Sequence, residues 1–393
     1  MIKNFLHKNY LIYGGSIVAT RVLEYAVLFF AAHYLSKDNY GELEYYKKLI
    51  EVVSSVFAFG FPALIISYTK SKESKQYFFL LGCIFVLLLA IVSMLVLGIF
   101  NWLFLLVPFV FYALFFNGGI TPAYLLVKEG SNYASVYKIL ISGLFYAVIF
   151  VAIYFFDVTG MAYVVAGYIL FPIAFVYVGY QLLQQKLVKQ KILKYGRLFK
   201  KLLLSSFTLV VSNFANLMFL YTDIFIIKII SENANTEIAN YSFALNVANM
   251  LLLIPLTLVQ VDIEKLKNNF SHVSVLNKRI VLLSGLAAIF LVFVYVMLIN
   301  TLYIDYKGFF TAFLIILAAK FVQSLSPLYG SLMVINKLFR KNLEVNLFAL
   351  VLNIVLSYFL YQYYSINGIA IASFISLVVR YIIQRIVLNK FYK

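Results

Sequence analysis

The sequence predicts an all-α polytopic membrane protein with twelve transmembrane helices in two six-helix lobes. Three observations lead to this fold class: the composition, a series of long apolar segments, and an internal repeat of about half the chain. The 393 residues are 64% hydrophobic and only 12% charged, and the mean hydropathy is +0.95. A soluble domain is excluded, because it has about 45–50% apolar residues and about 25% charged ones.

Each predicted span is an apolar segment long enough to cross a bilayer, which takes about 20 helical residues. Six lie in the first half, near 11–35, 43–68, 77–98, 102–125, 134–156 and 160–182. Six lie in the second half, near 202–230, 238–262, 279–303, 309–335, 343–363 and 368–388. We therefore expect an N-terminal lobe over residues 1–182, a basic cytoplasmic linker over 183–201 and a C-terminal lobe over 202–393.

Positive charge is concentrated in alternate loops. Most of the 32 Lys and Arg residues lie in or beside both termini and segments 69–76, 126–133, 183–201, 263–278 and 336–342. The positive-inside rule places both termini in the cytoplasm, which agrees with an even number of spans. The net charge of +17 is thus interpreted as a topology signal beside anionic lipid, not as a nucleic-acid site. For the linker, a docking site for a cytoplasmic partner is the alternative.

The two halves resemble each other in order and in register. Residues 157–162 (DVTGMA) match 365–370 (SINGIA), and residues 121–124 (TPAY) match 326–329 (SPLY). These matches predict duplication of a six-span unit, whose copies share one orientation because six is even. Transporters built this way bind substrate between the halves and alternate access to it. The proline of each second match is expected to bend its helix or to serve packing alone.

Four charges are predicted to share a layer near the membrane centre: Arg21 and Glu24 in the first span, Lys320 in the tenth and Arg380 in the twelfth. An ionisable group at that depth costs at least about 2.5–3.5 kcal/mol, so such groups face a protein interior or a water-filled cavity. The excess of positive charge predicts an anionic cargo. A structural Arg21–Glu24 pair and extension of Arg380 to the cytoplasmic surface are the alternatives.

Further charges lie in the outer half of the predicted spans. Lys47 and Glu51 are spaced i,i+4 on the second span, which predicts either a structural pair or a binding surface. Glu44 and Lys48 repeat this spacing and are expected to pair. Asp223 lies in the seventh span. We take Arg21, Lys320, Arg380 and Lys47 as substrate-binding candidates, and Glu24, Glu51 and Asp223 as candidates for ion coupling or ion pairing.

Signatures of enzymes and metal sites are missing from the sequence. The single cysteine, Cys83, lies in an apolar segment, and the three histidines are scattered. Neither metal-ligand spacing nor a phosphate-binding glycine loop occurs. We expect no catalytic residue, no metal and no cofactor.

The pattern resembles a known family. Twelve spans in two halves, with the loop 35–41 (LSKDNYG) after the first span, resemble the polysaccharide repeat-unit flippases (Wzx, or O-antigen translocase, type). These belong to the MATE-like superfamily of multidrug and lipid-linked oligosaccharide exporters. Residues 223–227 (DIFII), running to Tyr241 and Ser242, resemble the C-terminal half of that family, whereas Lys228 departs from its pattern. Lipid II flippases are expected to have two more spans.

The resemblance implies a flippase that moves undecaprenyl-diphosphate-linked oligosaccharides across the bacterial inner membrane by alternating access. O-antigen, capsule or exopolysaccharide assembly would use the product. The implied partners are this lipid-linked substrate, membrane lipids, a proton or sodium ion for coupling, and a polysaccharide polymerase, but no nucleic acid. A cation-coupled multidrug exporter of the same fold is the alternative, followed by a membrane-embedded polymerase or acyltransferase.

Overall fold

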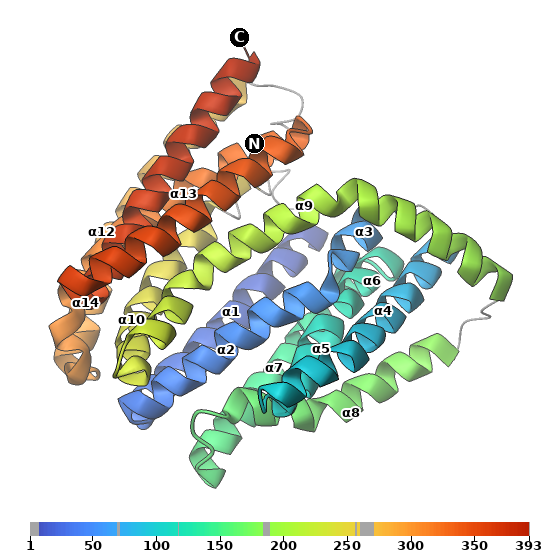
Figure 1. Ribbon diagram of the computed structural model, residues 1–393, viewed down its shortest axis with the longest axis horizontal. Coiled ribbons are helices and arrows are strands. Elements are labelled where there is room, and N and C mark those ends of the chain that lie inside the picture. The colour runs from blue at the N-terminus through green and yellow to red at the C-terminus, as the bar shows by residue number, and fades with distance from the viewer. Residues whose placement is uncertain are drawn as a thin grey trace. The chain divides into compact units, whose positions relative to one another are not determined.

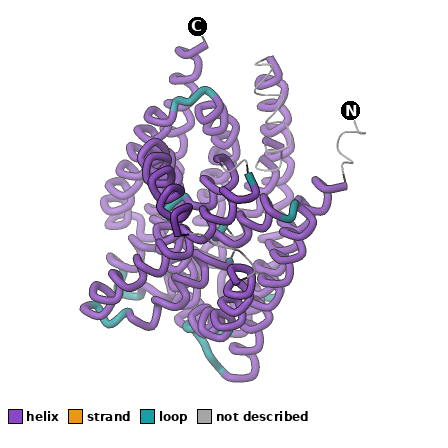
Figure 2. The backbone as a smooth tube through the Cα atoms, turned by 90° about the vertical axis from the view of Figure 1, so that its right-hand side faces the viewer, coloured by secondary structure: helices purple, strands orange, loops and turns teal. Residues whose placement is uncertain are grey.

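The structure is a computed structural model that describes residues 8–68, 71–116, 118–183, 189–255, 258–259 and 271–392. Helices joined by short loops make up these residues, and no strand occurs among them (Figure 2). Nine helices in this part of the chain are long and apolar enough to cross a membrane. The prediction of an all-helical, multi-pass membrane protein is confirmed at this level.

The contacts divide the chain into two compact units, named unit 1 and unit 2. Unit 1 comprises Met1–Ala31 and Tyr46–Val210, and unit 2 comprises Ala32–Tyr45 and Val211–Lys393. Three helices contribute to both units: α1 (Lys8–Tyr34), α2 (Lys37–Ala58) and α9 (Lys189–Ile230). Helix α9 is one long helix (green in Figure 1), so the segment expected as a linker is helical from Lys189 onward.

Unit 1 has an aromatic core between its helices. The rings of Phe111 and Phe145 stack at 5.8 Å between centroids, and those of Phe79 and Tyr124 at 4.2 Å. Aromatic pairs at this separation add to the apolar area that they bury. Besides its parts of the shared helices, unit 1 contains α3 (Phe61–Tyr68), α4 (Lys72–Ile99), η2 (Leu103–Leu105), α5 (Leu106–Phe115), α6 (Ile120–Lys128), α7 (Ser131–Phe156) and α8 (Ala162–Leu183).

Unit 2 also has an aromatic core between its helices. The rings of Tyr295 and Phe313 stack at 3.7 Å, and those of Phe243 and Tyr306 at 4.3 Å. Its further elements are α10 (Ala234–Asn249), η3 (Met250–Leu252), α12 (Ser271–Thr301), η4 (Ile304–Phe309), α13 (Phe310–Ile335) and α14 (Phe339–Tyr392).

Several expected spans are interrupted at residues with positive φ. The predicted span 43–68 breaks between α2 and α3, where Phe59 has φ 37° and Gly60 φ 75°. The predicted span 102–125 breaks between α5 and α6 beside Gly118, with φ 80°. Pro122 is the third residue of α6, where its missing N–H is not needed, so it does not bend the helix. Pro327 does lie inside α13.

Two predicted spans are joined in α14. Ser365, with φ 49° and ψ −135°, interrupts this helix between the expected segments 343–363 and 368–388. A Cβ on Gly368 would lie 2.2 Å from the Leu360 carbonyl oxygen, so only glycine permits this tight return of the chain. Helix α2 contains seven charged residues and is therefore not among the nine helices that are apolar enough to cross a membrane.

The loop 35–41 fixes the start of α2 within unit 2. The Asn39 amide donates to Ser36 Oγ at 3.3 Å, which caps the helix start. Lys37 Nζ donates to the Asp305 backbone oxygen at 2.7 Å. A Cβ on Gly41 would lie 1.7 Å from the Asn235 backbone oxygen, so α2 and α10 approach more closely here than any side chain allows.

Candidate functional site

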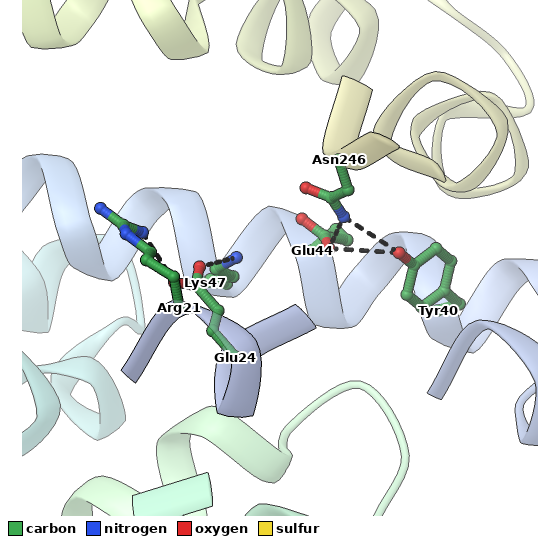
Figure 3. Close-up of polar contacts among 6 residues, drawn as sticks. All are labelled: Arg21, Glu24, Tyr40, Glu44, Lys47 and Asn246. Carbon is green, nitrogen blue, oxygen red and sulfur yellow. Dashed lines mark hydrogen bonds and ion pairs between the residues drawn. The ribbon is translucent and has the colours of Figure 1, made fainter. Parts of the chain in front are cut away.

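Glu24 of α1 lies between two cations in unit 1 (Figure 3). Its Oε2 is 2.7 Å from Arg21 NH1, one turn earlier on the same helix. Its Oε1 is 2.6 Å from Nζ of Lys47 on α2, a partner that spacing along α2 does not reveal. The Lys47 side chain is 2% exposed and that of Glu24 8%, whereas that of Arg21 is 51% exposed. Arg21 is therefore the member of this group that a ligand can reach.

Two further lysines add positive charge around this group. Lys48 on α2 is buried and interacts electrostatically with Glu24. Lys138 on α7 is partly buried and interacts electrostatically with Arg21. Lys138 lies two turns inside α7 and belongs to the site through this interaction, which no motif in the sequence indicates. We call Arg21, Glu24, Lys47, Lys48 and Lys138 the Glu24 centre, which carries more positive than negative charge.

The first part of α2 carries a separate polar group within unit 2 (Figure 3). Asn246 Nδ2 on α10 donates to Glu44 Oε1 at 2.8 Å and to the Tyr40 hydroxyl at 3.2 Å. The Tyr40 hydroxyl donates to Glu44 Oε1 at 3.3 Å. Glu44 is thus held by the amide of another helix, and its expected pairing with Lys48 stays a prediction. Glu51 lies one turn beyond Lys47 and is partly buried.

Asp223 of α9 is surrounded by neutral donors from three other segments of unit 2. Ser373 Oγ donates to both carboxylate oxygens, at 2.8 and 2.7 Å, and Asn353 Nδ2 donates to Oδ1 at 3.2 Å. The Tyr241 hydroxyl donates to Oδ2. Ser357 Oγ donates to Asn353 Oδ1 at 2.9 Å and extends the network. We call these five residues the Asp223 centre.

Lys320 and Arg380 lie in unit 2 with different partners. Lys320 Nζ donates to Gln323 Oε1 at 3.0 Å and interacts electrostatically with Asp223. Arg380 NH2 donates to Asn216 Oδ1 at 2.7 Å, and its guanidinium lies 5.8 Å from the centre of the Phe219 ring. Arg380 is only 7% exposed, and its guanidinium is bound inside unit 2.

Six of the seven predicted site residues form three groups, and Glu51 is in none of them. Arg21, Glu24 and Lys47 meet in unit 1, Asp223 has Lys320 nearby in unit 2, and Arg380 has its own surroundings there. The sequence-based prediction did not include the buried amides and hydroxyls of α14, although the sequence contains a signal for them. They recur at helical spacing along one apolar helix: Asn342, Asn346, Asn353 and Ser357.

No group of three or more His, Cys, Asp and Glu residues with the geometry of a metal site occurs among the described residues. Of the charged groups above, each buried carboxylate is instead bound by protein donors. The site therefore consists of charged and hydrogen-bonding side chains between helices. Such groups can bind a polar ligand.

Comparison with solved structures identifies the fold. A MATE-family multidrug transporter of the MOP superfamily in an inward-facing conformation matches with a TM-score of 0.66 and 13% identity, over 94% of this chain and 95% of that one. The same kind of transporter facing outward matches with a TM-score of 0.60 and 14% identity, over 96% and 92%. The lipid II flippase MurJ, inward closed, matches with a TM-score of 0.66 and 13% identity, over 96% and 87%.

Among curated proteins, none matches this chain. A family profile described as "Polysaccharide biosynthesis protein" matches residues 6–263. Together with the fold of flippases and transporters, this match confirms the predicted resemblance and agrees with the expectation that the chain is not an enzyme. The chain is a membrane protein of the MATE and MurJ fold and belongs to the polysaccharide biosynthesis protein family.

Proposed function

We propose that this protein is a flippase for undecaprenyl-diphosphate-linked oligosaccharide repeat units. It moves them from the cytoplasmic to the outer leaflet of the bacterial inner membrane by alternating access, for O-antigen, capsule or exopolysaccharide assembly. The observation that carries the proposal is the positively charged Glu24 centre inside the helices of a polysaccharide biosynthesis protein. A diphosphate is the charged part of such a cargo.

The geometry of the Glu24 centre supports anion exchange. Lys47 is buried and holds Glu24 from α2, whereas half of the Arg21 side chain is exposed. An arriving diphosphate competes with Glu24 for Arg21, because a guanidinium binds phosphate oxygens through two parallel hydrogen bonds. Glu24 keeps Lys47 when Arg21 turns to the cargo. The carboxylate thus offsets part of the positive charge of the site until the ligand arrives.

The Asp223 centre is the proposed coupling site. It offers a carboxylate with amide and hydroxyl groups, and oxygen ligands of this kind suit a hard cation. A proton or a sodium ion on Asp223 would remove its negative charge and replace some of the present donor bonds. Glu24 and Glu51 are the other candidates for this role. Lys320 stands close enough to Asp223 to sense that change electrostatically.

We further propose twelve crossings with both termini in the cytoplasm. The nine apolar helices include α14 as one helix, although Ser365 divides it into two segments that can each cross. Helices α1 and α2 add the remaining two, since Glu44 and Lys47 of α2 have partners inside the protein rather than facing lipid.

The proposal is tested by Arg21→Ala in a strain that lacks the native gene. We expect at least a tenfold loss of surface polysaccharide, accumulation of lipid-linked repeat units on the cytoplasmic leaflet, and partial rescue by Arg21→Lys. Lys320→Ala is the parallel variant in unit 2. Arg340→Ala is the matched control, because the Arg340 side chain is 88% exposed. Normal export by both Arg21→Ala and Lys320→Ala, at equal protein levels, would contradict the proposal.

A multidrug exporter is the second candidate, because a MATE-family multidrug transporter matches with the same TM-score as the lipid II flippase. Cationic drugs favour a site with excess negative charge, whereas the Glu24 centre has excess positive charge. Measuring drug susceptibility in the same strains separates the two functions. Loss of drug resistance with unchanged polysaccharide would support the exporter.

A further inference from the structure

Unit 2 contains a pocket of about 380 Å³ that the Glu24 and Asp223 centres do not include. Its walls come from α9, η3, α13 and both parts of α14. The volume lies within the range of about 300–1,000 Å³ typical of small-molecule sites. Its polar lining consists mainly of six side chains: Asn216, Gln323, Ser326, Asn342, Asn346 and Arg380.

Four polar atoms of these lining residues are buried and have no hydrogen-bond partner in the described part of the chain. They are Arg380 Nε, Asn342 Oδ1, Asn346 Oδ1 and Ser326 Oγ. All four residues are at least nine-tenths buried, with 3–7% exposure. A buried polar atom without a partner costs about 1–3 kcal/mol. Four of them on the lining residues of one pocket therefore leave hydrogen-bonding capacity that a ligand or ordered water can use.

The orientation of the amides is fixed by Ser212. Asn346 Nδ2 donates to the Ser212 backbone oxygen at 3.4 Å and to its Oγ at 2.9 Å. A backbone oxygen only accepts, so the nitrogen must face Ser212 and the Oδ1 atom must point elsewhere. Asn342 Nδ2 also donates to Ser212 Oγ, at 3.2 Å. The Asn346 amide oxygen is thus an acceptor that points away from Ser212, and the Asn342 oxygen likewise has no donor in the described part of the chain.

The guanidinium of Arg380 is held in place before any ligand binds. Asn216 Oδ1 accepts a hydrogen bond from Arg380 NH2, and the guanidinium lies over the Phe219 ring. No carboxylate is among the residues that line the pocket. A positive charge fixed in this way recognises an anionic group with little loss of side-chain freedom.

These lining groups together define the chemistry of the ligand. Arg380 requires an anion, whereas Asn342 and Asn346 require hydrogen-bond donors such as hydroxyls. Inorganic phosphate supplies few donors, and a cationic drug opposes Arg380. Leu220, Leu252 and Pro327 add apolar wall, against which the C–H face of a sugar ring can pack. The matching class is a polyhydroxylated anion.

We propose that this pocket binds an acidic sugar of the cargo. The sugar carboxylate pairs with Arg380, and its hydroxyls donate to Asn342 and Asn346. This proposal rests on the proposed flippase function and extends it to the class of glycan. The diphosphate and the acidic sugar thereby have separate binding groups, the Glu24 centre and the unit 2 pocket.

The test measures binding by calorimetry to the full chain purified in detergent. The probes are D-glucuronate, D-glucose, inorganic phosphate and glycerol 1-phosphate, the last representing a lipid headgroup with the same chemistry. We expect glucuronate to bind at least tenfold more tightly than the other three. Arg380→Gln should abolish the preference for glucuronate over glucose, and Arg340→Gln, at an exposed position, should keep it.

Equal binding of glucose and glucuronate, or an Arg380→Gln variant with unchanged glucuronate affinity, would overturn the proposal. Tighter binding of glycerol 1-phosphate than of glucuronate would overturn it too, in favour of a lipid headgroup. Arg380→Lys serves if Arg380→Gln does not fold. It keeps the charge and loses the planar fork, so glucuronate should weaken about tenfold while glucose is unchanged.

The export assay separates this proposal from the flippase function. If Arg21→Ala stops export while Arg380→Gln leaves the affinity for glucuronate unchanged, only the pocket proposal fails. If Arg21→Ala exports normally while glucuronate binds through Arg380, only the flippase function fails.

Discussion

Two buried carboxylates, Glu24 in unit 1 and Asp223 in unit 2, occupy opposite kinds of surroundings. Glu24 contacts the cations Arg21 and Lys47 at 2.7 and 2.6 Å. Asp223 accepts its hydrogen bonds from the neutral groups of Tyr241, Asn353 and Ser373. The first carboxylate is therefore neutralised by charge, and the second is stabilised by dipoles.

This difference indicates which kind of ligand each centre can bind. Cations that outnumber their carboxylate can release it for a stronger anion, so the Glu24 centre suits a phosphate. A carboxylate without a contacting cation keeps its negative charge available, so the Asp223 centre suits a proton or a metal cation. Under the proposed function, unit 1 provides anion binding and unit 2 provides ion coupling.

The largest expected effect comes from Lys47→Met. Removing one partner of a buried ion pair leaves an uncompensated charge and costs about 3–5 kcal/mol. Because Arg21 remains beside Glu24, we expect a loss near the lower limit, about 3 kcal/mol. The thermal midpoint of the purified protein, followed in detergent, measures the loss.

The double variant Glu24→Gln with Lys47→Met is the control for this result. It removes both charges of the pair, so stability should return towards the native value. If Lys47→Met alone leaves the thermal midpoint unchanged, Glu24 is not stabilised by charge and the contrast between the two centres fails.

Asp223→Asn is expected to have the next largest effect, on transport rather than on stability. The amide keeps the size of the side chain and removes the charge that would bind the coupling ion. Export of repeat units should fall at least tenfold, which corresponds to about 1.4 kcal/mol, while the thermal midpoint changes little. Replacing sodium by choline at constant pH then distinguishes sodium coupling from proton coupling in the native protein. Export by Asp223→Asn at the native rate would assign coupling to another group.

The two centres also show what the sequence can predict. Arg21, Glu24 and Asp223 are identifiable because a charge inside an apolar segment requires an explanation, and the spacing of Arg21 and Glu24 predicts their contact. The Lys47–Glu24 contact joins two helices whose relative rotation depends on packing, so spacing along α2 alone does not predict it. The partners of Asp223 are neutral and come from distant segments. The apolar pattern of the helices does not indicate which of their polar residues contact Asp223.

The same reasoning explains the fold. The helices follow the apolar segments, because length and composition decide them locally. The breaks at Phe59, Gly60 and Ser365 depend on backbone conformations with positive φ, for which only the glycine gives a sequence signal. The division of α1, α2 and α9 between the units depends on tertiary contacts and has no local signature.

Tyr241→Phe sharpens the comparison with a smaller effect. It removes a single neutral donor from Asp223 and leaves those of Ser373 and Asn353. The net loss of one hydrogen bond is about 0.5–1.5 kcal/mol, or up to about 3 kcal/mol where it leaves a buried charge less satisfied. Because Ser373 and Asn353 still donate to the carboxylate, we expect a loss near the lower limit for a bond to a charged group, about 1.5 kcal/mol, in the thermal unfolding of the purified protein. A loss as large as that of Lys47→Met would mean that neutral donors stabilise a carboxylate as strongly as cations do.

The smallest effect is expected for Lys191→Ala, which removes an ion pair of nearly the same length outside the buried centres. Lys191 Nζ lies 2.7 Å from Glu73 Oε1, and the two side chains are 50% and 43% exposed. The hydrogen bond from Lys191 to Glu73 and the charge of that carboxylate raise the pKa of Lys191. This stabilisation is complete below the ordinary lysine pKa and disappears as the pH rises through the raised one. Water and salt screen an exposed pair.

We therefore expect no measurable change in the thermal midpoint of Lys191→Ala at neutral pH, in low or high salt. The comparison with Lys47→Met isolates burial, because the two lysine–glutamate contacts differ by only 0.1 Å in length. Equal losses in the two variants would show that distance rather than burial sets the strength of these pairs. Burial of the Glu24 centre would then add nothing to the strength of its ion pairs.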